Sequence, residues 1–228
     1  MASTTVIHAS PTLEVARIES APFGQHTYVV RRPGMPDCVV VDPGFEPNAI
    51  AAWLEAHRLE PRAILLTHGH SDHIAGNAAL KRRWPDLPIL IGHRDAAKLG
   101  DPAANLSAPF GLSLTSPPAD RLLDDGERLL VAGLEMLVHE IPGHSLGHVV
   151  FVLTEESPPV VLGGDVLFRE GVGRTDFPDG DFGILAAGIR RHLYPLPDDT
   201  LVLPGHGEPT TVGHERRHNP FVPDGPRC

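Results

Sequence analysis

Short apolar runs alternate with amphipathic segments along the first half of the chain, and this pattern predicts repeated strand, turn and helix units. The run C-V-V-V is followed by the turn sequence D-P-G, and residues 47–58 then carry Ile50, Trp53 and Leu54 at helical spacing. The run R-A-I-L-L-T is followed by a histidine-rich segment and a predicted helix over residues 72–84, which Pro85 ends. Polar chemistry is therefore expected at the C-terminal end of a buried strand.

The second half is richer in strands than in helices. Apolar or alternating runs predict strands at R-L-L-V-A, E-M-L-V-H-E-I, H-V-V-F-V-L, P-V-V-L-G-G-D and T-L-V-L-P, with a helix over residues 182–193. Earlier strands are expected at L-E-V-A-R-I and H-T-Y-V-V, and a short helix near residues 95–99. Two β-rich halves that face each other, with helices on both outer faces, would bury all of these runs.

The segments without periodicity set the expected domain limits. Residues 1–11 are polar and aperiodic and are predicted to be disordered, which leaves a single domain over residues 12–228. The Pro-, Ser- and Ala-rich stretch 101–119 is predicted to be a long surface loop, and loops of this length are often functional lids.

Composition and charge exclude several classes of function. A net charge of −10 does not suit a surface that follows nucleic-acid phosphates. No run approaches the roughly 18 apolar residues of a membrane helix, and the N-terminus lacks a signal peptide, so we expect a cytoplasmic protein without a membrane partner. Two cysteines are too few for a disulfide framework, and Cys38 is expected in the core.

Histidine is the compositional anomaly, with 14 residues, several of them at short regular spacings. His68 and His70 are two residues apart in an extended segment, so their side chains can lie on the same side. Asp72 and His73 open the following helix and can point to the same place. The run H-G-H-S-D-H therefore predicts a local cluster of nitrogen and oxygen ligands.

Three further candidates stand where predicted strands end, each beside a glycine or proline that allows a sharp turn: His144 in P-G-H, Asp165 in G-G-D and His206 in P-G-H-G. Seven ligands exceed the needs of one tetrahedral ion and suit two divalent ions that share a carboxylate and keep open positions. Zinc is the expected metal, although iron and manganese also suit nitrogen and oxygen ligands. The remaining histidines are expected to be strand-edge or surface residues more often than ligands, among them His26, His93, His148, His192 and His218.

The motifs T-H-G-H-S-D-H, P-G-H, G-G-D and P-G-H-G, in this order, resemble those of the metallo-β-lactamase fold superfamily over about residues 12–222. This resemblance implies an α/β fold, a four-layer αββα sandwich of two mixed β-sheets flanked by helices. It also implies a ligand assignment in which Asp165 bridges the two ions. Asp42 would not bind a metal itself but would hold the ligand-bearing loop in place. The first metal would have His68, His70 and His144, and the second Asp72, His73 and His206.

Two longer segments, L-F-R-E-G-V-G-R-T-D-F-P-D-G-D and L-P-G-H-G-E-P-T-T, resemble the short, single-domain glyoxalase II-like branch of the superfamily. The resemblance implies hydrolysis of a small thioester such as S-lactoylglutathione by a metal-bridging hydroxide, with Asp72 orienting the nucleophile. The β-lactamases proper lack an aspartate at the position of Asp165, which disfavours antibiotic hydrolysis. Because the sequence ends soon after Pro220, we expect no C-terminal helical domain like that of full-length glyoxalase II.

Arg174 falls in the loop where related enzymes place a cationic residue for glutathione. A guanidinium can form a bidentate pair with a carboxylate, through two parallel hydrogen bonds. The alternative for Arg174 is a surface ion pair with Asp176 or Asp179.

Two other functions remain open. An Fe(II) persulfide dioxygenase acting on glutathione persulfide also carries G-R-T-D-F, although P-G-H-G-E-P and His148 favour the hydrolase. A non-catalytic metal-binding module is the less favoured alternative, because the ligand set is complete.

Overall fold

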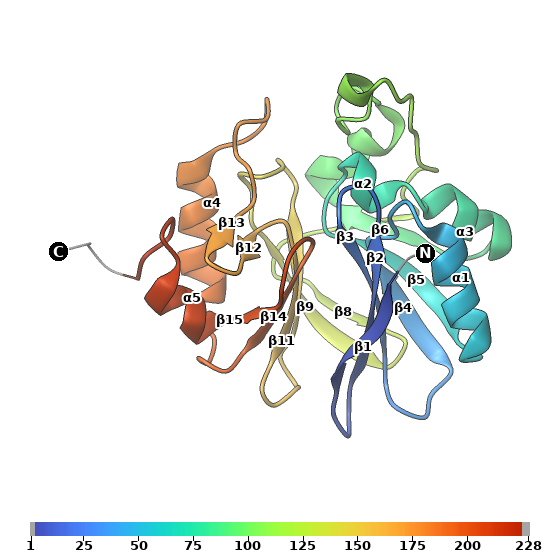
Figure 1. The fold of residues 1–228 in the computed structure, drawn as a ribbon, viewed down its shortest axis with the longest axis horizontal. Helices are drawn as coiled ribbons and strands as arrows, with labels where there is room; N and C mark the ends of the chain where they lie inside the picture. The colour runs from blue at the N-terminus through green and yellow to red at the C-terminus, as the bar shows by residue number, and fades with distance from the viewer. Residues whose placement is uncertain (1–2, 225–228) are drawn as a thin grey trace.

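Two β-sheets pack face to face and helices cover both outer faces (Figure 1). The computed structural model describes residues 3–224, so the ends of the predicted segments 1–11 and 12–228 lie outside the described residues. The predicted αββα sandwich is confirmed. None of the helices within residues 3–224 is both long and apolar enough to cross a bilayer.

The first sheet has seven strands whose spatial order follows the chain. Neighbouring strands from β1 to β4 are antiparallel, and those from β4 to β7 are parallel. The strands are β1 (Thr4–Ala9), β2 (Glu14–Ser20), β3 (Gln25–Arg31), β4 (Asp37–Val41), β5 (Glu60–Leu66), β6 (Ile89–Gly92) and β7 (Arg121–Leu123).

The second sheet has the order β15-β14-β11-β10-β9-β8, and only the pair β11 and β14 is parallel. Its strands are β8 (Arg128–Val131), β9 (Leu134–Glu140), β10 (Val149–Leu153), β11 (Val160–Gly164), β14 (Leu201–Pro204) and β15 (Thr210–Thr211). A separate hairpin consists of β12 (Leu167–Phe168) and β13 (Gly171–Val172).

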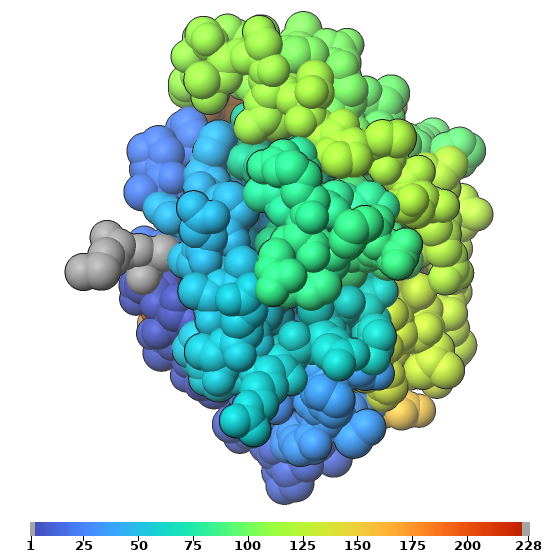
Figure 2. All heavy atoms as spheres, turned by 90° about the vertical axis from the view of Figure 1, so that its right-hand side faces the viewer, coloured from blue at the N-terminus to red at the C-terminus, as the bar shows by residue number. Residues whose placement is uncertain are grey.

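The helices form two outer layers. The first sheet is covered by α1 (Pro47–Ala56) and α3 (Asn77–Arg83), and the segment around residues 100–117 projects above them (Figure 2). The second sheet is covered by α4 (Phe182–Gly188), the π-helical η3 (Ile189–Leu193) and α5 (Val212–His218). The remaining short elements are α2 (Ser71–Ile74), η1 (His93–Gly100) and η2 (Ala108–Phe110).

The central strands are apolar at consecutive positions because both of their faces are covered. In β4, Val39 and Val41 face the other sheet, whereas Cys38 and Val40 face the helices. A strand covered on both faces needs apolar residues at every position, unlike a half-exposed strand. Cys38 is buried, as the sequence predicts.

Two predictions about the first half of the chain are wrong in detail. Residues 4–9 of the segment predicted to be disordered form β1, which pairs with β2 along the edge of the sheet. The helix predicted over 72–84 is broken into α2 and α3, because the Gly76 amide donates to the Pro43 carbonyl oxygen at 2.7 Å. A side chain at Gly76 would meet the Gly44 carbonyl oxygen at 2.8 Å, so this close approach requires glycine.

The stretch 101–119 has no strand and only the short helix η2, in line with the predicted surface loop. It is nevertheless anchored, because the buried Asn105 amide donates to the carbonyl oxygens of Lys98 and Leu114. The Asn105 carbonyl oxygen in turn accepts the backbone amide of Ser71, beside the histidine run. This loop therefore supports the segment that carries the predicted ligands.

Candidate metal centre

The seven predicted ligands gather at one edge of the sandwich. The run from His68 to His73 follows β5, Asp165 follows β11 and His206 follows β14. His144 lies in the connection from β9 to β10. Parallel strands end at the same edge of a sheet, and loops at that edge commonly hold ligands. The structure thus brings together residues up to 138 positions apart, from His68 to His206.

Three histidines form the inner part of this cluster. His144 Nε2 lies 3.3 Å from His68 Nε2 and 3.0 Å from His70 Nδ1. All three side chains are buried. Burial lowers the pKa of each imidazole below its ordinary value, and for His68 and His70 the neighbouring histidines lower it further. The three rings are therefore neutral and have lone pairs available for a cation.

Asp72, His73 and His206 form the outer part of the cluster. The Asp72 carboxylate lies 3.8 Å from His73 Nε2 and 3.3 Å from His206 Nε2. The side chains of Asp72 and His206 are 19% and 25% exposed, whereas the inner histidines are almost fully buried. Solvent therefore reaches the cluster from the side of Asp72 and His206.

Asp165 lies between the two triads. Its Oδ1 is 3.5 Å from His73 Nε2, and its Oδ2 is 3.5 Å from His144 Nε2 and 3.6 Å from His206 Nε2. One carboxylate thus faces ligand nitrogens of both groups.

Hydrogen bonds outside the cluster determine which ring nitrogen is free. The Nδ1–H of His144 donates to the Arg174 carbonyl oxygen at 2.8 Å, and the Nδ1–H of His206 donates to the Phe23 carbonyl oxygen at 3.1 Å. A neutral imidazole with its proton on Nδ1 has its lone pair on Nε2. Both Nε2 atoms point into the cluster, as metal ligands would.

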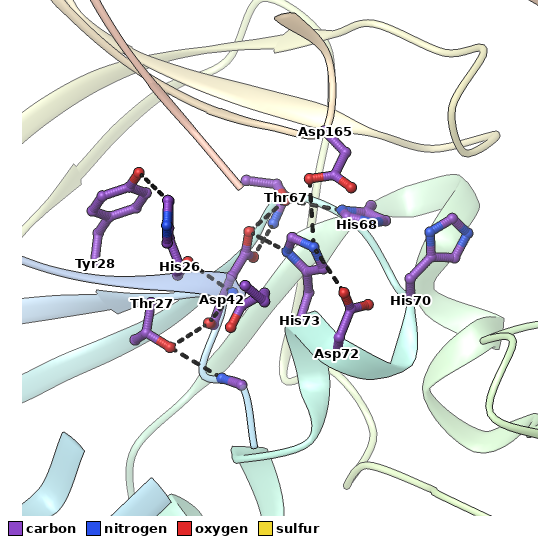
Figure 3. Close-up of polar contacts among 12 residues, drawn as sticks. His26, Thr27, Tyr28, Asp42, Thr67, His68, His70, Asp72, His73 and Asp165 are labelled. Atoms are coloured by element: carbon purple, nitrogen blue, oxygen red, sulfur yellow. Dashed lines mark hydrogen bonds and ion pairs between the residues drawn. The ribbon is translucent and has the colours of Figure 1, made fainter. Parts of the chain in front are cut away.

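Asp42 has the same effect on two other histidines (Figure 3). Its Oδ1 accepts the Thr67 amide at 2.7 Å, and its Oδ2 accepts the Thr67 hydroxyl at 2.6 Å and His73 Nδ1–H at 2.9 Å. Because the Thr67 hydroxyl donates to Asp42, it accepts from His68 Nδ1, 3.1 Å away. The Nε2 atoms of His68 and His73 are therefore directed inward as acceptors.

The cluster favours a cation at its centre. Burial alone would lower the pKa of His73, but the charges of Asp72, Asp165 and Asp42 outweigh it and raise the pKa to about 10. Burial would likewise raise the pKa of Asp72, but His73 and the hydrogen bond with His206 hold it well below its usual range. Three carboxylates thus call for positive charge beside His73, which a proton or a metal ion can supply.

Buried atoms without partners indicate that metal is the better fit. Among the described residues, His73 Nε2 and Asp165 Oδ1 face the cluster and are buried without a hydrogen-bond partner, and such orphaned groups are rare in native proteins. The ligand atoms of each triad lie within 4.8 Å of one another, as does a third set, Asp42, His68 and His73. The bonds that Asp42 already accepts make it a support for these ligands.

His148 stands directly before β10, as a strand-edge residue would, but the expectation that it could lie on the surface is wrong. His148 is fully buried, stacks on His68 with ring centroids 4.7 Å apart, and its Nε2 accepts the Asp165 amide at 3.0 Å. It therefore holds the backbone of the central carboxylate. Its position four residues after His144, in P-G-H-S-L-G-H, was the available signal.

His26 is also buried, contrary to the same expectation. Its Nδ1 lies 3.2 Å from the Pro204 carbonyl oxygen, which also accepts the Tyr28 hydroxyl at 2.6 Å. The His26 amide donates to the Gly205 carbonyl oxygen at 2.8 Å. These bonds attach the loop that carries His206 to β3.

A buried ion network supports the inner triad, and sequence reasoning did not find it. Asp95 Oδ2 accepts the Gly69 amide at 2.8 Å and the Ser145 hydroxyl at 2.5 Å. Lys98 Nζ bonds to the same hydroxyl and to Asp179 Oδ2, the latter at 2.6 Å. The loops of His70 and His144 are thereby joined, because Gly69 and Ser145 are their neighbours in sequence.

Arg174 is engaged in the alternative role that the sequence left open. Its guanidinium donates twice to Asp176, at 2.9 and 2.8 Å, and lies over the Phe177 ring at 4.6 Å. Both charged side chains are 68% exposed. Phe177 also contacts the rings of His70 and His144, at centroid distances of 5.2 and 5.7 Å. Arg174 thus stands at the rim of the cluster, and its role toward substrate stays a prediction.

A family model described as the metallo-beta-lactamase superfamily matches residues 21–206, a span that contains every predicted ligand. The chain belongs to this superfamily. Hydroxyacylglutathione hydrolase GloC of Haemophilus influenzae is 36% identical over 192 residues, which cover 82% of this chain and 87% of that protein. The probable metallo-hydrolase YqgX of Bacillus subtilis is 37% identical over 186 residues, covering 81% and 87%. The superfamily, the fold and a metallo-hydrolase relationship are thus established.

Solved structures of the same fold cover most of the chain. The B3 metallo-beta-lactamase BLEG-1 has a TM-score of 0.86 and 38% identity, covering 90% of this chain and 98% of its own. TTHA1623, described in a di-iron-bound form, has a TM-score of 0.78 and 38% identity, covering 90% and 99%. ETHE1 from Myxococcus xanthus has a TM-score of 0.75 and 26% identity, covering 91% and 84%.

Proposed function

We propose that this protein hydrolyses a small thioester, an acyl-glutathione or related acyl-thiol, at a two-metal centre. The observation that carries the proposal is Asp165, whose two carboxylate oxygens face the inner and the outer triad. A carboxylate in this position suits two ions a few ångströms apart. The 36% identity to a hydroxyacylglutathione hydrolase over most of both chains supports the reaction class.

His68, His70 and His144 would hold one ion, and Asp72, His73 and His206 the other. Two such ions, zinc in our proposal, would lower the pKa of a water between them and polarise the substrate carbonyl. Thiolate is a good leaving group and needs no proton from the protein. The main task of the surrounding residues is therefore to orient the water and the substrate. Asp72 stays ionised and can accept a hydrogen bond from a water that points toward the carbonyl carbon.

Aromatic side chains flank the exposed side of the centre. Phe23, whose carbonyl accepts His206, packs against Phe110 with ring centroids 5.3 Å apart, and both rings are partly exposed. Phe177, beneath Arg174, lines the side of the inner triad. Apolar walls with a few polar groups are typical of small-molecule sites. They suit a substrate whose acyl or thiol part is compact, with Arg174 available for a carboxylate once it leaves Asp176.

A persulfide dioxygenase that uses one Fe(II) is the second candidate. It is supported by a structure 38% identical to this chain that is described in a di-iron-bound form, which makes iron a candidate metal. All ligands are nitrogen or oxygen atoms, which suit iron as well as zinc. The two candidates therefore differ in metal count and in the use of oxygen.

Metal analysis and parallel activity assays on the purified protein separate these functions. We expect two metal ions per chain and hydrolysis of S-D-lactoylglutathione, without oxygen uptake on glutathione persulfide. Oxygen uptake with one iron per chain would refute the thioesterase. A chromogenic β-lactam belongs in the same series, because a metallo-β-lactamase is among the structural neighbours. Turnover of the β-lactam but not of the thioester would replace the proposed substrate class.

Asp165→Ala tests the two-metal centre itself. We expect the variant to lose at least one ion per chain and most of its hydrolysis, because ligands of both triads face this carboxylate. The matched control is Asp199→Ala, which removes an exposed aspartate. Unchanged metal content and rate in Asp165→Ala would show that Asp165 is not the bridge.

A further inference from the structure

We propose a second metal-binding site, formed by Asp125, His139 and His192, on the outer side of the second sheet. The ligand would be a single divalent transition-metal ion of the zinc class. The ligand atoms of these three residues lie within 4.8 Å of one another. The proposal is independent of the reaction at the cluster of the seven predicted ligands, called the His/Asp cluster below, because none of the three residues belongs to it.

Three separate elements supply the three side chains. Asp125 lies in the turn between β7 and β8, His139 near the end of β9, and His192 in η3. The Asp125 Oδ1 and His139 Nδ1 atoms are 3.5 Å apart. The rings of His139 and His192 have centroids 4.4 Å apart and a tilt of 38°. Ligand atoms at roughly 2.0–2.2 Å from a tetrahedral zinc ion are about 3.4 Å apart, close to the separation of Asp125 Oδ1 and His139 Nδ1.

His139 offers an unpaired, buried ring nitrogen to this site. Within β9, Met136 and Val138 face the interior of the sandwich, whereas Leu137 packs into the cluster beneath the outer helices. Strand alternation places His139 on that outer face. Its Nδ1 is buried and has no hydrogen-bond partner among residues 3–224. A buried polar atom of this kind normally has a protein, water or metal partner.

The backbone determines the position of the carboxylate. Asp125 Oδ1 accepts the Glu140 amide at 3.0 Å, and the Gly126 amide donates to the Val138 carbonyl oxygen at 2.9 Å. The turn is thereby attached to β9 on either side of His139. Asp125 and His139 are thus held close together by the fold, not by a flexible surface contact.

A rare helical turn brings the third residue into place. After α4 the helix continues as the π-helical η3, in which the Tyr194 amide donates to the Ile189 carbonyl oxygen at 3.0 Å. π-helical turns are uncommon and often occur at functional sites. Burial, followed by the nearby His139, lowers the pKa of His192, which keeps a lone pair available.

Two imidazoles and one carboxylate form a donor set that suits zinc and similar ions. The Asp125 side chain is 48% exposed, so water can complete the coordination and the ion can enter from solvent. Glu140, which follows His139 in the chain, is paired with Arg94 at 3.2 Å. An ion bound here would join η3 to β9 and to the β7–β8 turn, and would therefore stabilise the outer helical layer against the sheet.

Zinc binding to protein whose His/Asp cluster is already loaded tests the site. After equilibrium dialysis against micromolar zinc, we expect one more zinc per chain in the wild type than in His192→Gln or Asp125→Asn. Zinc at 100 times its dissociation constant should raise the wild-type melting temperature by about 5–10 °C, through binding to the folded state alone. The two variants should show no such rise from this site.

Two controls make the result specific. His8→Gln removes a histidine that belongs to none of the predicted clusters and should bind as much zinc as the wild type. His192→Gln should keep the wild-type activity, because the site is not part of the hydrolytic centre. Equal zinc content in wild type, His192→Gln and Asp125→Asn would overturn the proposal, whatever the outcome for the thioesterase.

Discussion

Asp42→Asn should weaken metal binding without removing a single ligand. Asp42 accepts three hydrogen bonds, two from Thr67 and one from His73 Nδ1–H. The asparagine oxygen can keep the bond from the Thr67 amide. Its NH2 group then faces the Thr67 hydroxyl and His73 Nδ1–H, and both of these are donors that need an acceptor at this position. To avoid two opposed donors, His73 must move its proton to Nε2, the atom that faces Asp72 and Asp165.

The structure gives the expected size of this effect. Hydrogen bonds to a charged group are worth about 1.5–3 kcal/mol, so losing one or two should lower the free energy of unfolding by about 3 kcal/mol. Loss of a residue that orients a metal ligand typically costs about 10–100-fold in metal affinity. The backbone is not expected to suffer, because Asp42 has a φ of 49° and asparagine tolerates that region as well as aspartate does.

Competition with a chelator, together with urea unfolding of the metal-free chain, measures both quantities. The control is Asp37→Asn, at the start of β4, the strand that leads into Asp42; its carboxylate pairs with the half-exposed Arg62. Asp37→Asn should keep wild-type metal affinity. If Asp42→Asn binds metal as tightly as this control does, the inference that Asp42 sets the tautomer of His73 is wrong.

Three other variants test neighbouring parts of the centre. Gly205→Ala places a methyl group 2.2 Å from Asp165 Oδ1 and should lower metal content and the hydrolytic rate about 10-fold or more; Gly100→Ala, with open space around it, should not. Arg174→Ala should raise the KM for a glutathione thioester about 10-fold, with kcat unchanged, and an unchanged KM would remove Arg174 from the substrate site. Burial lowers the pKa of His26 from 6.5 to about 4. Between pH 6.5 and about 4, the His26 imidazole therefore binds a proton in the unfolded chain but not in the folded protein, so the free energy of unfolding falls as the pH falls. Between pH 7.5 and 5, urea unfolding should show about 2 kcal/mol less acid destabilisation in His26→Gln than in the wild type, and equal losses would contradict this origin.

Several features of the protein follow from the sequence by itself. The run from His68 to His73 after an apolar strand, with glycine or proline beside His144, Asp165 and His206, was enough to predict a metal site and the layered fold. These signals are local, because strand ends, tight turns and neighbouring side chains depend on residues close in sequence.

Other features depended on contacts between distant segments. The polar residues 4–9 become a strand only because β2 offers an edge to pair with, and the helix predicted over 72–84 breaks only because Gly76 meets the Pro43 carbonyl. The sequence around His148 does not reveal that its ring lies under the Asp165 amide. Similarly, Arg174 could bind substrate or a neighbouring acid, and the folded loop pairs it with Asp176.

The sequence thus determined which chemical groups are present and at which strand ends they stand. Only the tertiary structure decided which nitrogen of each histidine is free, which carboxylate faces both triads, and that Asp125, His139 and His192 meet on the outer side of the second sheet. Tautomer, burial and the distance between ligands arise from partners far apart in the chain, and no local pattern encodes them.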